Sequence, residues 1–333
     1  MADLVPFRWP ASWHDPAQLD AIRDTPFNCA VGDDIAPDVA GAMRKCGVTV
    51  TSLKNAPALL LEDARWPQVQ MGANGDADAG PTGEPWIDSN GFAIQAARTV
   101  SPGKPVWVAS QPPPKRVLTP NDFRLAVCDA AAYGAKWLPS PDVAAWPQIV
   151  AAQRLFSEHS AWRDYRTVAR LAVVSDFAKA HRDLAVETLN LLTRLYVPFE
   201  VVPKSRESDL SRFAMVLNID DQPASTDPWE LATRIHAKLG RRNDVVRLWN
   251  GGSLNVIYTV AHDGQSGLLQ VVNYAAHEPG EAVSAWVLSP YRSARIYTLD
   301  RPQATPCDLH PASGGIEIYL PPFPVYAAIE LIK

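Results

Sequence analysis

The chain has 333 residues, and its 31 Lys and Arg residues are outnumbered by 36 Asp and Glu residues, which gives a formal net charge of -5 at pH 7. This acidic balance offers no basic face to a phosphate backbone, so we expect no nucleic acid partner. The hydrophobic fraction is 47% and the length exceeds what one compact core usually holds, which predicts several separately packed units.

The sequence carries no signal for a membrane, a metal or a nucleotide. The first fifteen residues lack a basic region followed by an apolar stretch, and no segment approaches the roughly 18 apolar residues of a membrane span. We therefore expect a cytoplasmic protein with no membrane partner. No Gly-x-Gly-x-x-Gly run follows a strand, which predicts no nucleotide cofactor. The scattered cysteines predict reduced core thiols and no zinc site; they are Cys29, Cys46, Cys128 and Cys307.

Up to about Tyr165, short apolar strands alternate with capped helices, as in βα units around a parallel sheet. The first unit is a strand over 27–31 followed by a helix that Pro37 opens and Gly47 ends. The remaining predicted elements are strands over 48–53, 104–109 and 136–138, and helices over 91–100, from the Thr119 capping box to Gly134, and from Pro147 to Trp162.

This region is too short for a closed barrel. A complete eight-stranded barrel takes about 200 residues or more, whereas residues 1–165 supply about five strands. We therefore predict a partial TIM-like barrel. The run of Gly, Asp, Ala and Pro between Asn74 and Gly83 has no periodicity, which predicts a surface loop.

The next region, 166–249, predicts a small open α/β layer. A near-continuous apolar run after Ala169 is typical of a central parallel strand. A helix over 184–196 and strands over 199–202 and 213–219 follow it. A capping box at Asp227 then begins a helix that Gly240 ends.

From Asn250 to the end of the chain the helical period disappears, and turn signals separate short strands. At least six strands at hairpin spacing indicate a β-sandwich over residues 250–333. These strands are 255–260, 268–274, 283–288, 294–299, 316–320 and 325–331.

Two segments carry a family resemblance. The run Gly103 to Pro112, with its Pro-Val-Trp strand, and the helix from Phe123 to Ala135, with its Ala-Tyr-Gly-Ala ending, resemble the β-galactosidases of glycoside hydrolase family 42. The resemblance covers most of the chain after about Pro105. It implies a barrel, then a flavodoxin-like trimerisation layer, then a β-sandwich, and hence a possible homotrimer.

The resemblance also implies where the catalytic carboxylates would stand. The family's nucleophilic Glu follows the Pro-x-Trp strand, and the matching position here is Ser110, beside Gln111. A neutral hydroxyl neither attacks as a carboxylate does nor stabilises an oxocarbenium-like charge. The family's acid/base Glu follows an Asn, and this sequence contains no Asn-Glu dipeptide. Both expected carboxylates are absent by this comparison.

A relocated acid pair is the alternative. Glu84 and Asp88 flank Trp86 just before a predicted helix, at the strand ends where barrel enzymes place functional side chains. This predicts Glu84 and Asp88 as candidate catalytic acids. Asp88 or Ser89 is equally suited to cap the helix that begins near Gly91.

Other polar residues follow predicted strands. Asp33 and Asp34 follow the strand that ends at Val31, and Asn55 follows the strand that ends at Leu53. We predict them as substrate-binding residues, although an acidic turn before a helix N-terminus and a plain loop residue explain them as well.

Tryptophan is the strongest sign of a sugar ligand, because indole rings pack against the apolar faces of sugars. We predict Trp86, Trp107 and Trp137 as stacking residues of a carbohydrate cleft, with core packing as the alternative for each. The leading hypothesis is a glycoside-hydrolase-like protein of the β-galactosidase type. The alternatives are a non-catalytic carbohydrate-binding or oligomeric assembly subunit and a structural remnant.

Overall fold

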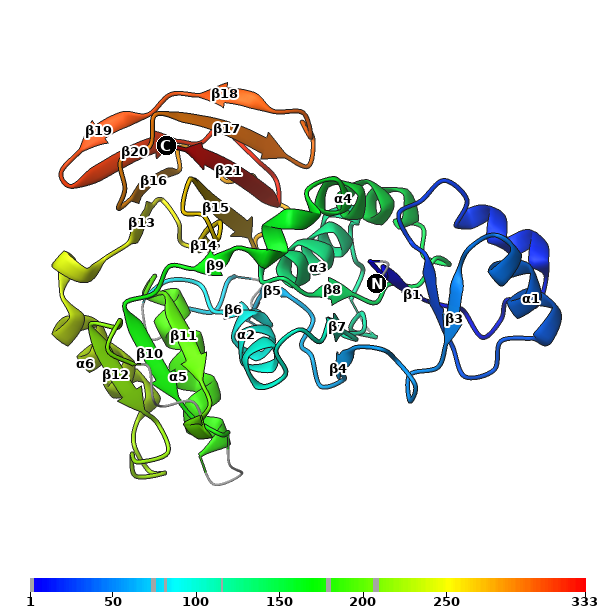
Figure 1. The fold of residues 1–333 in the computed structure, drawn as a ribbon, viewed down its shortest axis with the longest axis horizontal. Helices are drawn as coiled ribbons and strands as arrows, with labels where there is room; N and C mark the ends of the chain where they lie inside the picture. The colour runs from blue at the N-terminus through cyan, green and yellow to red at the C-terminus, as the bar shows by residue number, and fades with distance from the viewer. Residues whose placement is uncertain (1–2, 73–75, 81–82, 115, 178–180, 206–209) are drawn as a thin grey trace.

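The computed structural model describes residues 3–72, 76–80, 83–114, 116–177, 181–205 and 210–333. The protein is a mixed α/β chain, with parallel sheets and their helices up to α6 and antiparallel sheets toward the C-terminus (Figure 1). None of the helices among the described residues is long and apolar enough to cross a membrane.

The N-terminal part holds two parallel sheets of three strands each. One has the order β1-β2-β3 and the other β4-β7-β8; the strands are Pro6–Arg8, Cys29–Val31, Thr49–Thr51, Leu59–Leu61, Val106–Val108 and Lys136–Trp137. The Arg8 amide donates to the Pro139 carbonyl over 2.7 Å, which joins β1 to the chain just after β8. No pairing joins β3 to β4, so the described strands do not close into a barrel.

The helices of this part form where the capping signals predict them. Pro37 opens α1, and Thr119 caps α3 through a reciprocal capping box with Asp122. The positive φ angles of Gly47 (78°) and Gly134 (85°) let the chain leave these two helices, since a residue without Cβ adopts this conformation freely. The bounds are η1 Pro16–Ala21, α1 Pro37–Lys45, α2 Gly91–Val100, α3 Pro120–Ala132, α4 Trp146–Glu158 and η2 Ser160–Asp164.

A small apolar cluster fills the space between the two N-terminal sheets. It contains Val31 of β2, Trp107 of β7 and Leu138 after β8, all nearly or fully buried. The sequence did not indicate that β7 points its Trp into this interior.

The segment before α2 contains a short antiparallel pair that the sequence did not predict. Gln68–Val69 (β5) pairs with Ile87–Asp88 (β6). The predicted loop between Asn74 and Gly83 lies partly outside the described residues, and Ala77 and Ala79 within it form isolated bridges.

The middle unit is a parallel sheet with the order β11-β10-β12, covered by two helices. Its bounds are β10 Leu171–Val174, α5 Arg182–Arg194, β11 Phe199–Val202, β12 Met215–Asn218 and α6 Pro228–Leu239. The apolar run predicted as a central strand is β10, and all four of its residues are buried because both of its edges are paired.

Two antiparallel sheets share one apolar core. Their strand orders are β13-β16-β20-β19 and β18-β17-β21-β15-β14-β9. The short η4 turn, Arg241–Asn243, precedes them. Their strands are β9 Arg166–Thr167, β13 Val246–Trp249, β14 Leu254–Val260, β15 Ser266–Asn273, β16 Ser284–Val287, β17 Ser293–Thr298, β18 Thr305–Cys307, β19 His310–Ala312, β20 Gly315–Tyr319 and β21 Tyr326–Ile332.

The observed elements correct two details of the sequence analysis. The sequence predicts one α/β layer over residues 166–249, but the strands at its two ends belong to the antiparallel sheets. β9 pairs with β14, and β13 pairs with β16. All four cysteines are free, but only Cys29 and Cys128 are buried; Cys46 is exposed because it caps α1 at the surface.

Candidate functional site

Asp88 lies at the end of β6 and is 6% exposed. Its carboxylate accepts hydrogen bonds from three side chains, the amides of Gln70 (3.0 Å) and Gln68 (3.2 Å) and the guanidinium of Arg65 (3.4 Å). No helix-capping bond involves Asp88; the backbone amide of Gly91 donates to the Ser89 hydroxyl instead (3.1 Å). The structure therefore makes Asp88 the centre of a polar cluster, and α2 begins after Asn90 without a side-chain capping bond.

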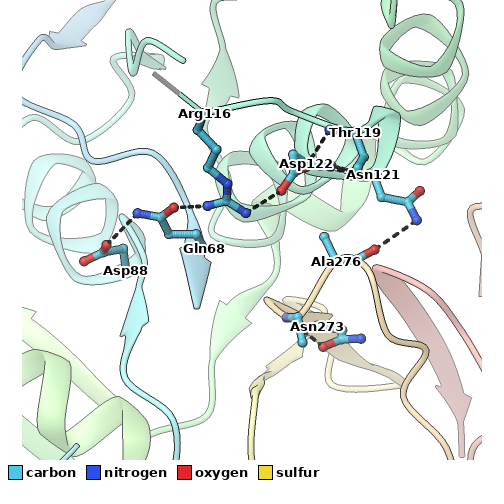
Figure 2. Close-up of polar contacts among 9 residues, drawn as sticks. Gln68, Asp88, Arg116, Thr119, Asn121, Asp122, Asn273 and Ala276 are labelled. Carbon is cyan, nitrogen blue, oxygen red and sulfur yellow. Dashed lines mark hydrogen bonds and ion pairs between the residues drawn. The ribbon is translucent and has the colours of Figure 1, made fainter. Parts of the chain in front are cut away.

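A chain of polar contacts runs from Asp88 to a second buried carboxylate (Figure 2). Gln68 donates to Asp88 and accepts from Arg116, and Arg116 forms an ion pair with Asp122 over 3.1 Å. Asp122 is 5% exposed and also accepts from the backbone amide of Thr119 (2.7 Å) and from its hydroxyl (2.8 Å). Two side chains therefore stand between the carboxylates of Asp88 and Asp122. We call Arg65, Gln68, Gln70, Asp88, Arg116 and Asp122 the Asp88 cluster.

Aromatic rings from the same segments pack together. The Trp66 ring meets Phe123 and Trp137 edge to face, with 5.6 Å between centroids in both pairs. Trp66 is two residues before Gln68, and Phe123 directly follows Asp122. All three rings are buried, so they support the polar residues beside them and do not offer an open face.

The two predicted acids, Glu84 and Asp88, have different neighbours. Glu84 is exposed and faces the turn before β14, where a Cβ on Gly252 would lie 2.7 Å from Glu84 Oε2. Asp88 faces the two glutamines of the β5 segment. The structure therefore does not bring this pair together.

The predicted stacking residues are covered by protein. Trp107 is 0% exposed and lies in the cluster between the N-terminal sheets, and Trp137 is 3% exposed and donates from Nε1 to the Ser110 carbonyl (3.1 Å). Trp86 is half-buried against the core of the middle unit. Burial of Trp107 and Trp137 is incompatible with an open stacking face, because core packing takes up both ring faces.

Of the remaining predicted binding residues, Ser110 is buried at 2% exposure, and four are exposed. Gln111 folds back to donate to the Ala109 carbonyl (3.3 Å). The other three, Asp33, Asp34 and Asn55, lie on the loops after β2 and β3. No contact recorded within the described residues links any of them to the Asp88 cluster.

The sequence analysis missed most of the Asp88 cluster. Gln68 and Gln70 are two residues apart, the spacing that puts two strand side chains on one face, and this was the available signal. The sequence offered no such signal for Arg65 and Arg116, because both are far from Asp88 along the chain and come near it only on folding.

No group of three or more His, Cys, Asp or Glu side chains that could hold a metal ion occurs in the part of the chain that the structure describes. The Asp88 cluster offers guanidinium and amide donors beside carboxylates, a mixture that suits a hydroxylated ligand. Gln68 and Arg116 link its two carboxylates in the chain of contacts.

Sequence comparisons assign no family. No protein-family model matches the chain. No curated protein matches it either.

Solved structures are similar in fold. α-L-fucosidase isoenzyme 2 from Paenibacillus thiaminolyticus aligns with a TM-score of 0.58 at 10% identity, over 95% of this chain and 79% of that one. A rhamnosidase from Novosphingobium sp. PP1Y aligns with a TM-score of 0.45 at 10% identity, over 88% of this chain and 38% of that one. A β-galactosidase from Rahnella sp. R3 aligns with a TM-score of 0.43 at 10% identity, over 88% of this chain and 65% of that one.

Of these three alignments, that with the fucosidase scores above 0.5, and at 10% identity it bears on the fold alone. The chain therefore has a glycoside-hydrolase-like fold, at a sequence identity that assigns it to no family.

Proposed function

We propose that this protein binds carbohydrate through the Asp88 cluster and does not hydrolyse it. The observation that carries the proposal is the arrangement around Asp88, whose carboxylate accepts from three side chains and, among the described residues, contacts no second carboxylate. Sugar hydroxyls both donate and accept hydrogen bonds, and carboxylates, amides and guanidinium groups supply the complementary partners.

The cluster is accessible from one side. The side chains of Arg65 and Arg116 are 49% and 35% exposed, whereas the carboxylates of Asp88 and Asp122 behind them are nearly buried. An arriving ligand would meet the two guanidinium groups first. Their remaining N–H groups can donate to the hydroxyl oxygens of a ligand.

Hydrolysis requires two carboxyl groups facing one glycosidic bond, about 5 to 5.5 Å apart for retention or roughly 6.5 to 9.5 Å for inversion. Gln68 and Arg116 lie between Asp88 and Asp122, and Asp122 also holds the α3 capping box. The carboxylate of Asp122 is held by the α3 capping box and by Arg116, so it is not free to approach a glycosidic bond.

We further propose that the three parts of the chain correspond to an opened barrel, a flavodoxin-like layer and a β-sandwich. The parallel order β11-β10-β12, with the first strand of the layer in the centre, supports the flavodoxin-like description. The shared core of the two antiparallel sheets supports the sandwich.

Calorimetric titration of the full chain with galactose-containing oligosaccharides tests the binding proposal. We expect the parent chain to bind these oligosaccharides. Asp88→Asn and Arg116→Gln should each weaken the affinity about tenfold, because each removes one charged hydrogen bond. Asp221→Asn, a change at an exposed carboxylate of the middle unit, is the matched control and should leave binding unchanged. Circular dichroism establishes that the variants fold. Absence of binding to any oligosaccharide, or binding that neither cluster variant alters, would overturn the proposal.

A β-galactosidase-type hydrolase is the second candidate. Two buried carboxylates, Asp88 and Asp122, favour it. One chain of contacts connects them, and Arg116 in that chain is partly exposed (Figure 2). If the parent hydrolyses an aryl β-galactoside and Asp88→Asn abolishes that turnover, this candidate replaces the binding proposal. Equal background rates in the parent, Asp88→Asn and Glu84→Gln would remove it.

A further inference from the structure

A cavity lies at the edge of the parallel strands where β7 and β8 begin, opposite the Asp88 cluster. Its volume is about 630 Å³, and its lining comes from the N-terminal part, the middle unit and the antiparallel sheets. Sites for small molecules usually have about 300 to 1,000 Å³. The cavity is therefore large enough for a small organic ligand.

Cations predominate in this lining although the whole chain is acidic. The cavity is lined by six cationic side chains and three carboxylates; the cations are Arg98, Lys104, Lys136, Arg163, Arg166 and Arg212, and the carboxylates are Asp3, Asp164 and Glu200. The chain as a whole has a net charge of -5. A local excess of positive charge on an acidic protein focuses the field on this cavity and attracts anions.

The carboxylates are already engaged. Asp3 pairs with both Lys136 and Arg163, Asp164 lies 3.8 Å from Arg163, and Glu200 pairs with Arg212 over 2.6 Å. Three cations remain without an ion pair among the described residues: Arg98, Lys104 and Arg166.

Arg98 is the most informative of these three. Its guanidinium donates to two backbone carbonyls, those of Tyr133 (2.9 Å) and Arg163 (2.6 Å), which fix its position but do not neutralise its charge. A Cβ at residue 134 would collide with Arg98 Nη1, so Gly134 gives the guanidinium its space. Burial lowers the pKa of Arg98, which the charge of Asp164 opposes. A partly buried cation that no described carboxylate pairs with directly is costly to maintain, and a bound anion would offset that cost.

We propose that this cavity binds a small ligand carrying a phosphate monoester. The geometry points to an oxyanion because Arg98, Lys104 and Arg166 reach the same cavity from α2, from the loop before β7 and from β9. A phosphate monoester carries close to two negative charges at pH 7, and its three terminal oxygens accept from guanidinium forks. A carboxylate, with one charge and two oxygens, matches three unpaired cations less well. This proposal does not depend on the Asp88 cluster, which lies at the other edge of the strands.

Binding of glucose 6-phosphate to the full chain, measured by calorimetry at fixed ionic strength, tests this proposal. Inorganic phosphate, glucuronate and glucose serve as the other probes. We expect glucose 6-phosphate and inorganic phosphate to bind, glucuronate to bind more weakly and glucose not to bind. Increasing the NaCl concentration should weaken the interaction.

Two variants locate the site. Lys104→Gln and Arg166→Gln alter exposed side chains and are expected to fold normally, and each should weaken phosphate binding about tenfold. Lys45→Gln removes an exposed charge at the end of α1 and should have no effect, as the matched control. Equal affinities for glucuronate and glucose 6-phosphate would overturn the phosphate assignment. No phosphate binding, or the same loss of binding in the Lys45 control, would overturn the site itself.

Discussion

At the scale of single residues, Asp129 holds together segments that are far apart in the sequence. This carboxylate on α3 is 1% exposed and accepts from the hydroxyls of Tyr274 (2.6 Å) and Ser89 (2.7 Å). It also accepts from the backbone amide (3.1 Å) and the side-chain amide (2.9 Å) of Asn90. Burial raises the pKa of Asp129 because the charged form loses its hydration, while these hydrogen bonds oppose the rise.

Replacing Asp129 with Asn should lower the free energy of unfolding at pH 7 by about 1 to 3 kcal/mol, since the new amide group would face the Asn90 donors. Urea denaturation measures this loss, with Asp221→Asn as the exposed control. The pKa of Asp129 is higher in the folded than in the unfolded chain, so the folded state retains the proton more strongly. The parent should therefore lose stability relative to Asp129→Asn as the pH rises from about 4 through the raised pKa. A difference that stays constant over this range would contradict the assignment.

The same scale explains the tryptophans. Sequence reasoning correctly placed Trp107 and Trp137 on strands, and it predicted that both rings line a sugar cleft. Which face of a strand meets solvent depends on what packs against it. Trp107 meets the facing sheet, and Trp137 meets Trp66 and Phe123.

At the scale of elements, local signals were the most informative. Asp227 caps α6, where its carboxylate accepts from the Glu230 amide over 2.8 Å and Pro228 takes the first helical position. Gly240 ends the helix with a φ of 65°. These signals act within a few residues, so the sequence reveals them without tertiary information.

Asp227→Ala should lower the free energy of unfolding by about 1 kcal/mol, because the first turn of α6 loses the partner of a backbone amide. Asp227→Ser keeps an oxygen acceptor at the cap and should recover most of this loss. Thermal unfolding of the three proteins, followed by circular dichroism at 222 nm, provides the measurement. Equal stability of the Ala and Ser variants would show that the cap contributes nothing.

At the scale of the whole molecule, Arg194 connects the three parts of the chain. It lies on α5 of the middle unit, and its guanidinium donates to the carbonyls of Pro85 (3.2 Å), Gly252 (2.6 Å) and Leu254 (3.1 Å). Burial lowers the pKa of Arg194, which the neighbouring Tyr196 and Glu84 oppose. A second connection is the Gln270 side chain of β15, which donates to the Ala132 carbonyl at the end of α3 (3.0 Å).

Arg194→Met keeps an unbranched side chain but leaves these carbonyls without their donor. We expect it to lower the free energy of unfolding by about 3 kcal/mol or more and to separate the melting of the middle unit from that of the remaining chain. Differential scanning calorimetry would then record two transitions. Arg234→Gln, a change at an exposed position of α6, is the control. A single transition at the parent temperature in Arg194→Met would disprove the coupling.

The homotrimer that the resemblance implies stays a prediction, which sedimentation velocity of the full chain would test. The comparison of folds does not bear on it, because a shared fold at 10% identity carries no information about subunit contacts.

The sequence by itself determined the mixed α/β character, the helix ends and most strands, because capping bonds, glycine turns and side-chain periodicity act over a few residues. It did not determine several short strands, whose few residues form strands only because a partner pairs with them. These strands are β1, β4, β5, β6, β9, β13, β18 and β19.

Only the tertiary structure decided the candidate sites. It joined Asp88 to Arg65, Gln68 and Gln70 and separated it from Glu84, and it gathered Arg98, Lys104 and Arg166 at one cavity. Hydrogen bonds and ion pairs depend on distances in space. The fold sets those distances by packing elements whose separation along the chain carries no such information.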